Sequence, residues 1–95
     1  MWAEKKINYG ETRMIYLDLV QEDFEINPPA NPCWELTEYE TGRVESSGIC
    51  TTEAIEHGYT LYALITPQHK GIYRLIYSFG VGQELRRPCM IINVK

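Results

Sequence analysis

Short segments of alternating apolar and polar residues recur along the whole chain, and this period of two constrains the fold more than any other feature. In residues 12–20, for example, Ile15, Leu17 and Leu19 fall on one face of an extended strand. Turn residues interrupt the segments at short intervals, which is typical of sandwiches and barrels and not of βαβ folds. Strands are expected at residues 2–9, 12–20, 33–39, 43–47, 49–52, 59–65, 71–79 and 85–94.

The chain has 95 residues, the size of one domain, and 44% of them are hydrophobic, which is enough for a single core. We therefore expect one all-β domain over residues 1–95. The first segment, 2–9, is expected to be an edge strand. Residues 80–83 are expected to form a tight hairpin.

Three segments depart from the simple alternation. Residues 24–32 contain three prolines, which cannot donate ladder hydrogen bonds, and this predicts a loop or an edge crossing. Residues 52–57, followed by Gly58, could form a single helical turn, because glycine commonly ends helices. Pro88 marks an edge or a bulge within the last strand.

Two features indicate an immunoglobulin-like β-sandwich. Trp34 lies on the third expected strand, where that fold places its core tryptophan. Residues 67–75, which include Tyr73 and Leu75, match the corner that leads into the sixth strand of that fold, where a tyrosine hydroxyl bonds to the loop backbone. Leu75 then takes the position of the second disulfide cysteine, and Leu17 or Leu19 would face it. The sequence predicts a sandwich of about seven strands without the usual inter-sheet disulfide, and a small barrel is the main alternative.

Five stretches resemble small immunoglobulin-like proteins of tailed phages and prophages, namely residues 10–13, 34–36, 44–48, 71–75 and 81–87. The resemblance implies a virion structural or assembly role through protein–protein contacts, first in the host cytoplasm and then in the virion. It carries over no functional residue. The proline-rich loop at 27–32 and the three cysteines depart from the family pattern and leave the partner surface open. The alternative is a carbohydrate- or surface-binding adhesion module of the same fold.

Charge is distributed unevenly along the chain. Residues 1–57 hold twelve acids and four bases, a net −8, whereas residues 58–95 hold one acid and five bases, a net +4, which together give the overall −4. A net negative charge argues against nucleic acid as a partner. Pairing between strands of the two halves would explain the division. The alternative is a charged patch that guides copies or partners to dock.

No pattern of catalytic or cofactor-binding residues is found, and we expect neither an enzyme nor a cofactor. The cysteines and histidines lack the close C-x₂₋₄-C or H-x₃₋₅-H spacing of structural zinc sites, so no metal site is predicted. The odd number of cysteines, Cys33, Cys50 and Cys89, fits a reducing compartment, where each would act as a small half-buried hydrophobe. From the sequence we expect neither a membrane-spanning segment nor a signal peptide.

The best binding candidates are aromatic residues on the outward alternation and the arginines of the basic half. Their expected partners are proteins, including further copies of this chain in a ring or other homo-oligomer; nucleic acid and membrane are not expected partners. The candidate interface residues are Trp2, Tyr9, Tyr16, Tyr39, Tyr62, Arg74, Arg86 and Arg87.

Overall fold

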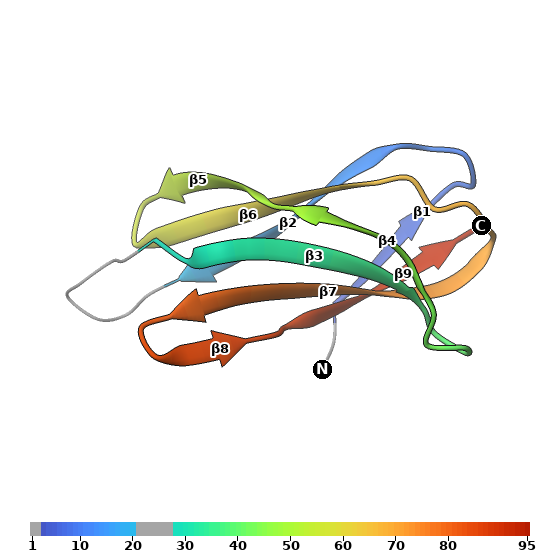
Figure 1. Cartoon of the computed structure of the whole chain (residues 1–95). Helices are drawn as coiled ribbons and strands as arrows, with labels where there is room; N and C mark the ends of the chain where they lie inside the picture. The colour runs from blue at the N-terminus through green and yellow to red at the C-terminus, as the bar shows by residue number, and fades with distance from the viewer. Residues whose placement is uncertain (1–2, 21–27) are drawn as a thin grey trace.

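The structure is a computed structural model that describes residues 3–20 and 28–95. Its secondary structure is entirely β, and the strands are arranged in two layers (Figure 1). Nine strands lie within the described residues: β1 (Glu4–Ile7), β2 (Arg13–Val20), β3 (Ala30–Glu38), β4 (Val44–Ile49), β5 (Thr51–Ile55), β6 (Gly58–Ile65), β7 (Gly71–Val81), β8 (Glu84–Arg86) and β9 (Cys89–Val94).

The strands form two separate sheets. The large sheet has the order β1-β9-β7-β3-β4, and β8 pairs with β7 beside this path. The small sheet has the order β2-β6-β5. All pairings are antiparallel except that of β1 with β9, which is parallel. This arrangement is a β-sandwich and confirms the predicted all-β class.

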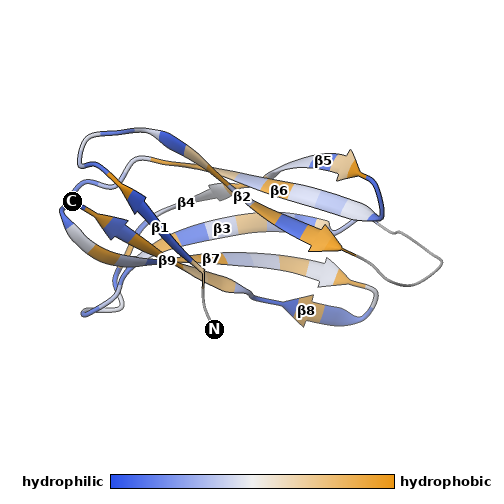
Figure 2. Ribbon diagram, turned by 180° about the vertical axis from the view of Figure 1, so that it is seen from behind, coloured by the Kyte–Doolittle hydropathy of each residue, from blue (hydrophilic) through white to orange (hydrophobic). Residues whose placement is uncertain are grey.

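The core lies between the sheets and is built from alternate residues of the long strands. Figure 2 shows the alternation as changes of colour along β2 and β9. Every second side chain along these strands is buried, which removes one face of each sheet from water. This burial supplies most of the stabilisation of a sandwich. Alternate residues of β3, β7 and β9 are buried in this core, namely Trp34, Leu36, Tyr73, Leu75, Tyr77, Phe79, Met90, Ile92 and Val94.

The predicted corner before β7 is present. The Tyr73 hydroxyl donates a hydrogen bond to the carbonyl oxygen of His69, four residues earlier, at 3.3 Å. Leu75 is fully buried in the same cluster as Trp34, and Leu17 and Leu19 pack against that cluster. Aliphatic and aromatic packing therefore occupies the centre of the sandwich, as expected.

A second buried tyrosine connects the two sheets. The hydroxyl of Tyr77, on β7 of the large sheet, donates to the carbonyl oxygen of Ile15, on β2 of the small sheet, at 3.2 Å. Burial raises the pKa of this hydroxyl far above its usual value, so it stays protonated and remains a donor.

The predicted helical turn at residues 52–57 is wrong. This segment forms most of β5, which pairs with β6 and turns back through Glu56 and His57. Gly58 ends no helix; it begins β6, where an added Cβ would overlap the carbonyl oxygen of Leu19. Glycine is needed there because the backbones of β2 and β6 come too close for a Cβ atom. The local sequence around Gly58 does not reveal this requirement.

The described prolines lie at an irregular pairing or outside the strands. Pro32 lies inside β3 and not in a loop, at a register shift between Ala30 and Cys33, and its carbonyl accepts a hydrogen bond from the Cys50 amide. Residues 24–27 of the irregular segment predicted at 24–32 lie outside the described residues. Pro88 separates β8 from β9, which divides the single strand predicted at 85–94.

Candidate functional site

The predicted interface residues do not form one patch. The structure brings Tyr16 together with Tyr62, and Tyr39 together with Arg74, on opposite faces of the sandwich. Trp2 lies outside the described residues. Arg87 lies beside Glu35 and Ser78 on the same sheet face as Tyr39 and Arg74. Tyr9 and Arg86 occupy separate positions, because the ring of Tyr9 lies near Lys70 and Arg86 pairs with Glu84.

The first surface is the outward side of β2, β6 and β5, which we call the small-sheet face. Tyr16 and Tyr62 are directly opposite each other in the β2–β6 ladder, with ring centroids 6.4 Å apart. Lys5 reaches over from β1, and its Nζ lies 5.5 Å from the Tyr16 ring. The strand registers assign ten outward residues to this face: Met14, Tyr16, Asp18, Val20, Thr51, Glu53, Ile55, Thr60, Tyr62 and Leu64.

Two carboxylates lie at the centre of the small-sheet face. Asp18 accepts a 2.6 Å hydrogen bond from the Thr60 hydroxyl, and Glu53 accepts one from the Tyr62 hydroxyl at 3.3 Å. Desolvation and the nearby Glu53 carboxylate raise the pKa of Tyr62. None of the ten residues is a lysine or arginine, but Lys5 of β1 lies over the Tyr16 ring, so the face carries two carboxylates and one ammonium group, a net charge of −1.

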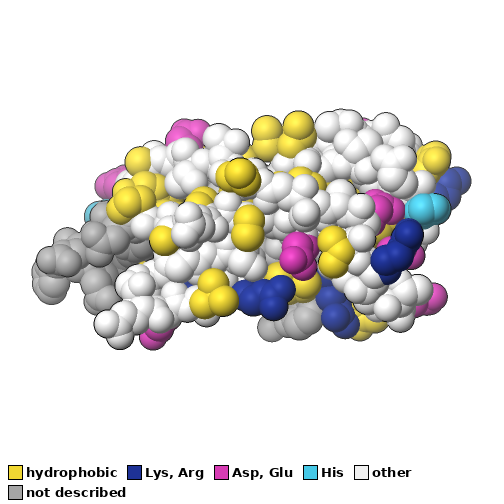
Figure 3. Space-filling view, viewed as in Figure 1, with side chains coloured by type: hydrophobic (Ala, Val, Ile, Leu, Met, Phe, Trp, Pro, Cys, Tyr) yellow, Lys and Arg dark blue, Asp and Glu magenta, His cyan; other side chains and the backbone are white. Residues whose placement is uncertain are grey.

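The second surface is the outward side of the large sheet, which we call the large-sheet face. Figure 3 shows hydrophobic side chains with basic and acidic groups among them on the side that bears β3 and β7. Ile49 and Leu85 are 85% and 72% exposed, and Ile72 and Tyr39 are also exposed. The face comprises Cys33, Glu35, Tyr39, Ile49, Ile72, Arg74, Ile76, Ser78, Leu85, Arg87 and Ile91.

Two arginine side chains contact residues of the large-sheet face. The Arg74 guanidinium carbon is 4.6 Å from the centroid of the Tyr39 ring, a cation–π contact. Arg87 donates from Nε to the Ser78 hydroxyl at 3.3 Å and lies 3.9 Å from the carboxylate of Glu35. β1 adds Glu4 and Lys6 on the same side, so three bases stand against two acids and the face carries a net charge of +1, opposite in sign to that of the small-sheet face.

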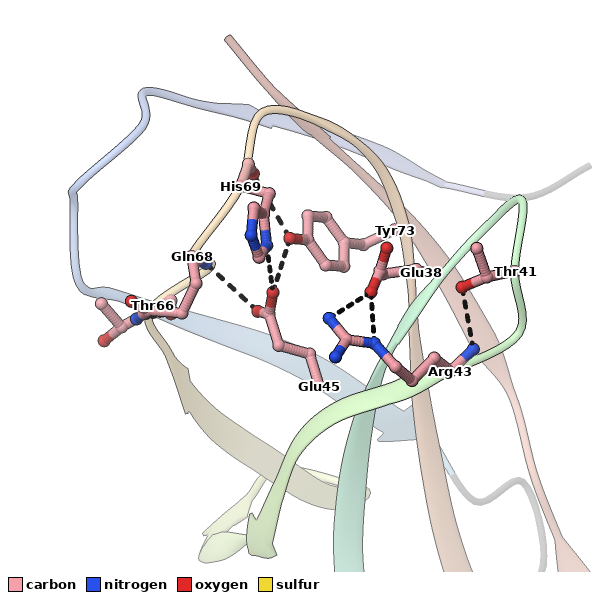
Figure 4. Close-up of polar contacts among 8 residues, drawn as sticks. All are labelled: Glu38, Thr41, Arg43, Glu45, Thr66, Gln68, His69 and Tyr73. Atoms are coloured by element: carbon pink, nitrogen blue, oxygen red, sulfur yellow. Dashed lines mark hydrogen bonds and ion pairs between the residues drawn. The ribbon is translucent and has the colours of Figure 1, made fainter.

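A polar cluster that the sequence did not reveal lies at the end of the sandwich (Figure 4). Glu45, whose side chain is only 8% exposed, accepts hydrogen bonds from the Tyr73 hydroxyl at 2.8 Å and from the Gln68 amide at 3.2 Å. The Nδ1 atom of His69 lies 3.2 Å from the same carboxylate. The cluster joins the turn before β7 to β4.

The pKa directions in this cluster follow from its bonding. Burial opposes the charge on Glu45, but the bonds from Tyr73, Gln68 and His69 outweigh it and lower the pKa of the carboxyl. Burial and the Glu45 carboxylate together raise the pKa of Tyr73 to about 12. Glu45 is thus ionised and Tyr73 protonated at neutral pH, a pairing that suits a structural tie.

A cavity of about 320 Å³ adjoins this cluster, between the turn after β3 and the turn before β7. The Glu38 carboxylate on its wall forms an ion pair with Arg43 at 2.6 Å. Within the described residues, no group of three or more histidine, cysteine or acidic side chains is placed to hold a metal ion. Among its polar groups, Glu38 bonds to Arg43, and His69 and Tyr73 bond to Glu45, and these contacts hold the turns. The lining residues are Glu38, Tyr39, Glu40, Thr41, His69, Lys70, Gly71, Ile72 and Tyr73.

The three cysteines are free and occupy different environments. Cys33 is exposed, which differs from the half-buried position expected for it, whereas Cys50 is buried and Cys89 is half-buried. Burial raises the pKa of Cys50 to about 11 and that of Cys89 above its usual value. Among the residues described, no helix is long and apolar enough to span a membrane.

The alternation of inward and outward residues along the strands could have located the small-sheet face but not the rest of the site. Asp18 lies two residues after Tyr16 in the segment 12–20, so the two side chains are expected on the same face of the strand. The Glu45 cluster could not be seen in the sequence, because Glu45 lies more than twenty residues before Gln68, His69 and Tyr73. Comparisons of the chain with protein-family models, with curated proteins and with solved structures give no significant match.

Proposed function

We propose that this chain is an immunoglobulin-like module that works by protein–protein contact, as a structural or assembly component of a phage or prophage virion. The observation that carries the proposal is the pair of exposed sheet faces, each with large hydrophobic and aromatic side chains that the core does not use. Exposed side chains of this kind, when grouped on one face, are typical of interaction surfaces.

The strand order supports the immunoglobulin-like assignment. In that fold, strands C, F and G form one sheet and strands B, E and D belong to the other. Here β3, β7 and β9 are neighbours in the large sheet, and β2, β6 and β5 form the small sheet. β4 would then be the additional strand beside C, and Tyr73 the tyrosine of the corner.

The virion role follows from the resemblance of five sequence stretches to phage and prophage proteins of this fold. A non-enzymatic role is consistent with the polar clusters, because the bonds of Glu45, Asp18 and Glu38 serve to tie turns and strands together. Such a protein would be made in the host cytoplasm and would end in the particle.

The test is recovery of the chain from particles produced by a host that carries its gene. We expect mass spectrometry to detect the chain in density-purified particles, and deletion of the gene to lower the yield of intact particles. A complementing plasmid copy is the control. A chain found only in the free protein fraction, with particle yield unchanged by the deletion, would contradict the virion role.

One observation favours the second candidate, a carbohydrate-binding adhesion module. Tyr16 and Tyr62 lie beside the Asp18 and Glu53 carboxylates, and aromatic rings with carboxylates can stack on and hydrogen-bond to sugars. In a glycan-binding screen, the adhesion reading predicts binding that Tyr62→Ala abolishes. Absence of binding to any glycan by the wild-type chain would remove this candidate.

A further inference from the structure

We propose that the partner of the small-sheet face is the large-sheet face of a second copy of this chain. The inference rests on the proposed role in protein contact and names the partner. In this arrangement, copies stack head to tail, with the outer surface of β2, β6 and β5 of one copy lying on β3 and β7 of the next.

Both faces offer the apolar area that such a contact requires. On the small-sheet face, Met14, Leu64 and Val20 are more than half exposed. On the large-sheet face, Ile49 and Leu85 are largely exposed. Docking the two faces would remove these side chains from water, which is the main driving force of most protein association.

Charge selects unlike faces over like faces. The small-sheet face has Asp18 and Glu53 against Lys5, which reaches over from β1. Two copies of this face brought together would place four carboxylates against two lysines, and the excess like charge opposes the contact. The large-sheet face has Arg74, Arg87 and Lys6 against Glu35 and Glu4. The pairing of opposite faces is therefore the favoured one.

The dimensions of the small sheet set the size of the contact. It has three strands of five to eight residues, which at about 4.8 Å between strands and about 3.3 Å per residue cover roughly 14 Å by 26 Å. This footprint is smaller than the roughly 800 Å² that a standard interface takes from each partner, so we expect a weak, reversible contact.

The edge strands are poorer docking sites than the faces. β1, at one edge of the large sheet, consists of Glu4, Lys5, Lys6 and Ile7, of which only Ile7 is buried. Charged residues on an edge strand, lysine above all, oppose pairing with another chain. Because the two faces differ, the resulting contact is heterologous, and it generates rings if the rotation closes and filaments if it does not.

The test is the oligomeric state of the purified full chain, measured by sedimentation velocity up to about 1 mM protein at low and high salt. We expect reversible oligomers whose dissociation constant rises with salt, since exposed charges are screened over about 8 Å at physiological ionic strength. Glu53→Lys and Arg87→Glu should each weaken association about tenfold. Both side chains are exposed, so both variants should keep the wild-type circular dichroism spectrum and melting temperature.

The decisive experiment is the association of an equimolar mixture of the two variants. Each variant alone would oppose like charges, whereas the mixture pairs the new lysine with the new glutamate and should associate more tightly than either variant. Glu56→Lys and Lys95→Glu make the same charge changes outside both faces and should associate like the wild type. Equal weakening by these controls, or a mixture no tighter than its components, would overturn the pairing of faces.

The outcome also separates this inference from the virion role. A wild-type chain that is monomeric at about 1 mM in low salt overturns self-docking, even if the chain is recovered from particles. A chain that self-docks but is absent from particles overturns the virion role alone. Glycan binding by a chain that stays monomeric would assign the small-sheet face to a sugar and overturn the proposal.

Discussion

Glu45 is the residue on which the end of the sandwich most depends. Its nearly buried carboxylate accepts bonds from Tyr73 and Gln68 and contacts His69, so it joins β4 to the turn before β7. Because these bonds lower its pKa in the folded state below the reference value of 4.5, the ionised form stabilises the fold. That stabilisation is complete above the unfolded pKa and is lost as the pH falls through the folded pKa.

Replacing Glu45 by glutamine should therefore reduce both stability and its dependence on acid. We expect Glu45→Gln to lower the free energy of unfolding at neutral pH by about 1.5–3 kcal/mol, the usual range for hydrogen bonds to a charged group. Urea melts between about pH 7 and pH 3 should show a smaller loss of stability in the variant. Glu40→Gln, exposed in the turn after β3, is the control. A Glu45→Gln variant that loses stability with acid as steeply as the wild type would contradict this role.

The three cysteines should react at different rates because their environments differ. Cys33 is exposed, whereas burial raises the pKa of Cys50 to about 11 and so suppresses its reactive thiolate. With a chromogenic disulfide reagent, the native protein should show one fast thiol, which Cys33→Ser removes. Denaturant should then expose about three thiols per chain, the number in the sequence. A fast phase that survives in Cys33→Ser would show that the fold leaves another thiol open.

At the scale of elements, β7 holds the sandwich together. It pairs with β3, β8 and β9 and buries four consecutive inward side chains, among them the fully buried Leu75. We expect Leu75→Ala to cost about 2–5 kcal/mol, since it removes core contacts and leaves a cavity. Leu85→Ala makes the same chemical change at an exposed position and should stay within about 0.5 kcal/mol. Denaturant melts of both variants check this, and a nearly neutral Leu75→Ala would contradict the central position of β7.

Alternation predicted the long strands well because both sheets bury one face. A period of two fixed the inward sides of β3, β7 and β9, and the corner at Tyr73 was recognisable from its residues alone. The segment at 52–57 was misjudged because its strand character comes from pairing with β6, a partner that local sequence does not identify. Pro32 was placed outside the strand for a similar reason, since a register shift in β3 accommodates it.

The candidate site was less predictable than the fold. Aromatic residues were correctly placed on outward positions at Tyr16 and Tyr39, but their grouping depends on which strands become neighbours. The sequence order puts β2 far from β6, and only the ladder brings Tyr16 opposite Tyr62. The uneven charge of the two halves was visible in the sequence. The registers were needed to place Asp18 and Glu53 on the small-sheet face and Arg74 on the large-sheet face.

For the molecule as a whole, the connections between the sheets predict a single cooperative unfolding transition. Cys50 carries the chain from β4 of the large sheet to β5 of the small sheet, and the Tyr77 hydroxyl bonds to Ile15 across the core. Neither sheet can bury its inward face without the other, so we expect no stable half-folded state. The pairing of β2 with β6 and of β3 with β7 joins distant parts of the chain, and refolding should therefore take milliseconds to seconds.

Two probes that report on different parts of the molecule check this prediction. Trp34 is buried in the core, so its fluorescence follows packing, and replacing Trp2 by phenylalanine leaves Trp34 as the sole tryptophan. Far-ultraviolet circular dichroism follows the strands of both sheets. In urea, the two signals should give coincident transitions, with the midpoint independent of the probe. Protein concentrations low enough to keep the chain monomeric exclude a contribution from self-docking. If the fluorescence changes at a lower urea concentration than the circular dichroism, the core opens before the sheets separate, and the two layers do not fold as one unit.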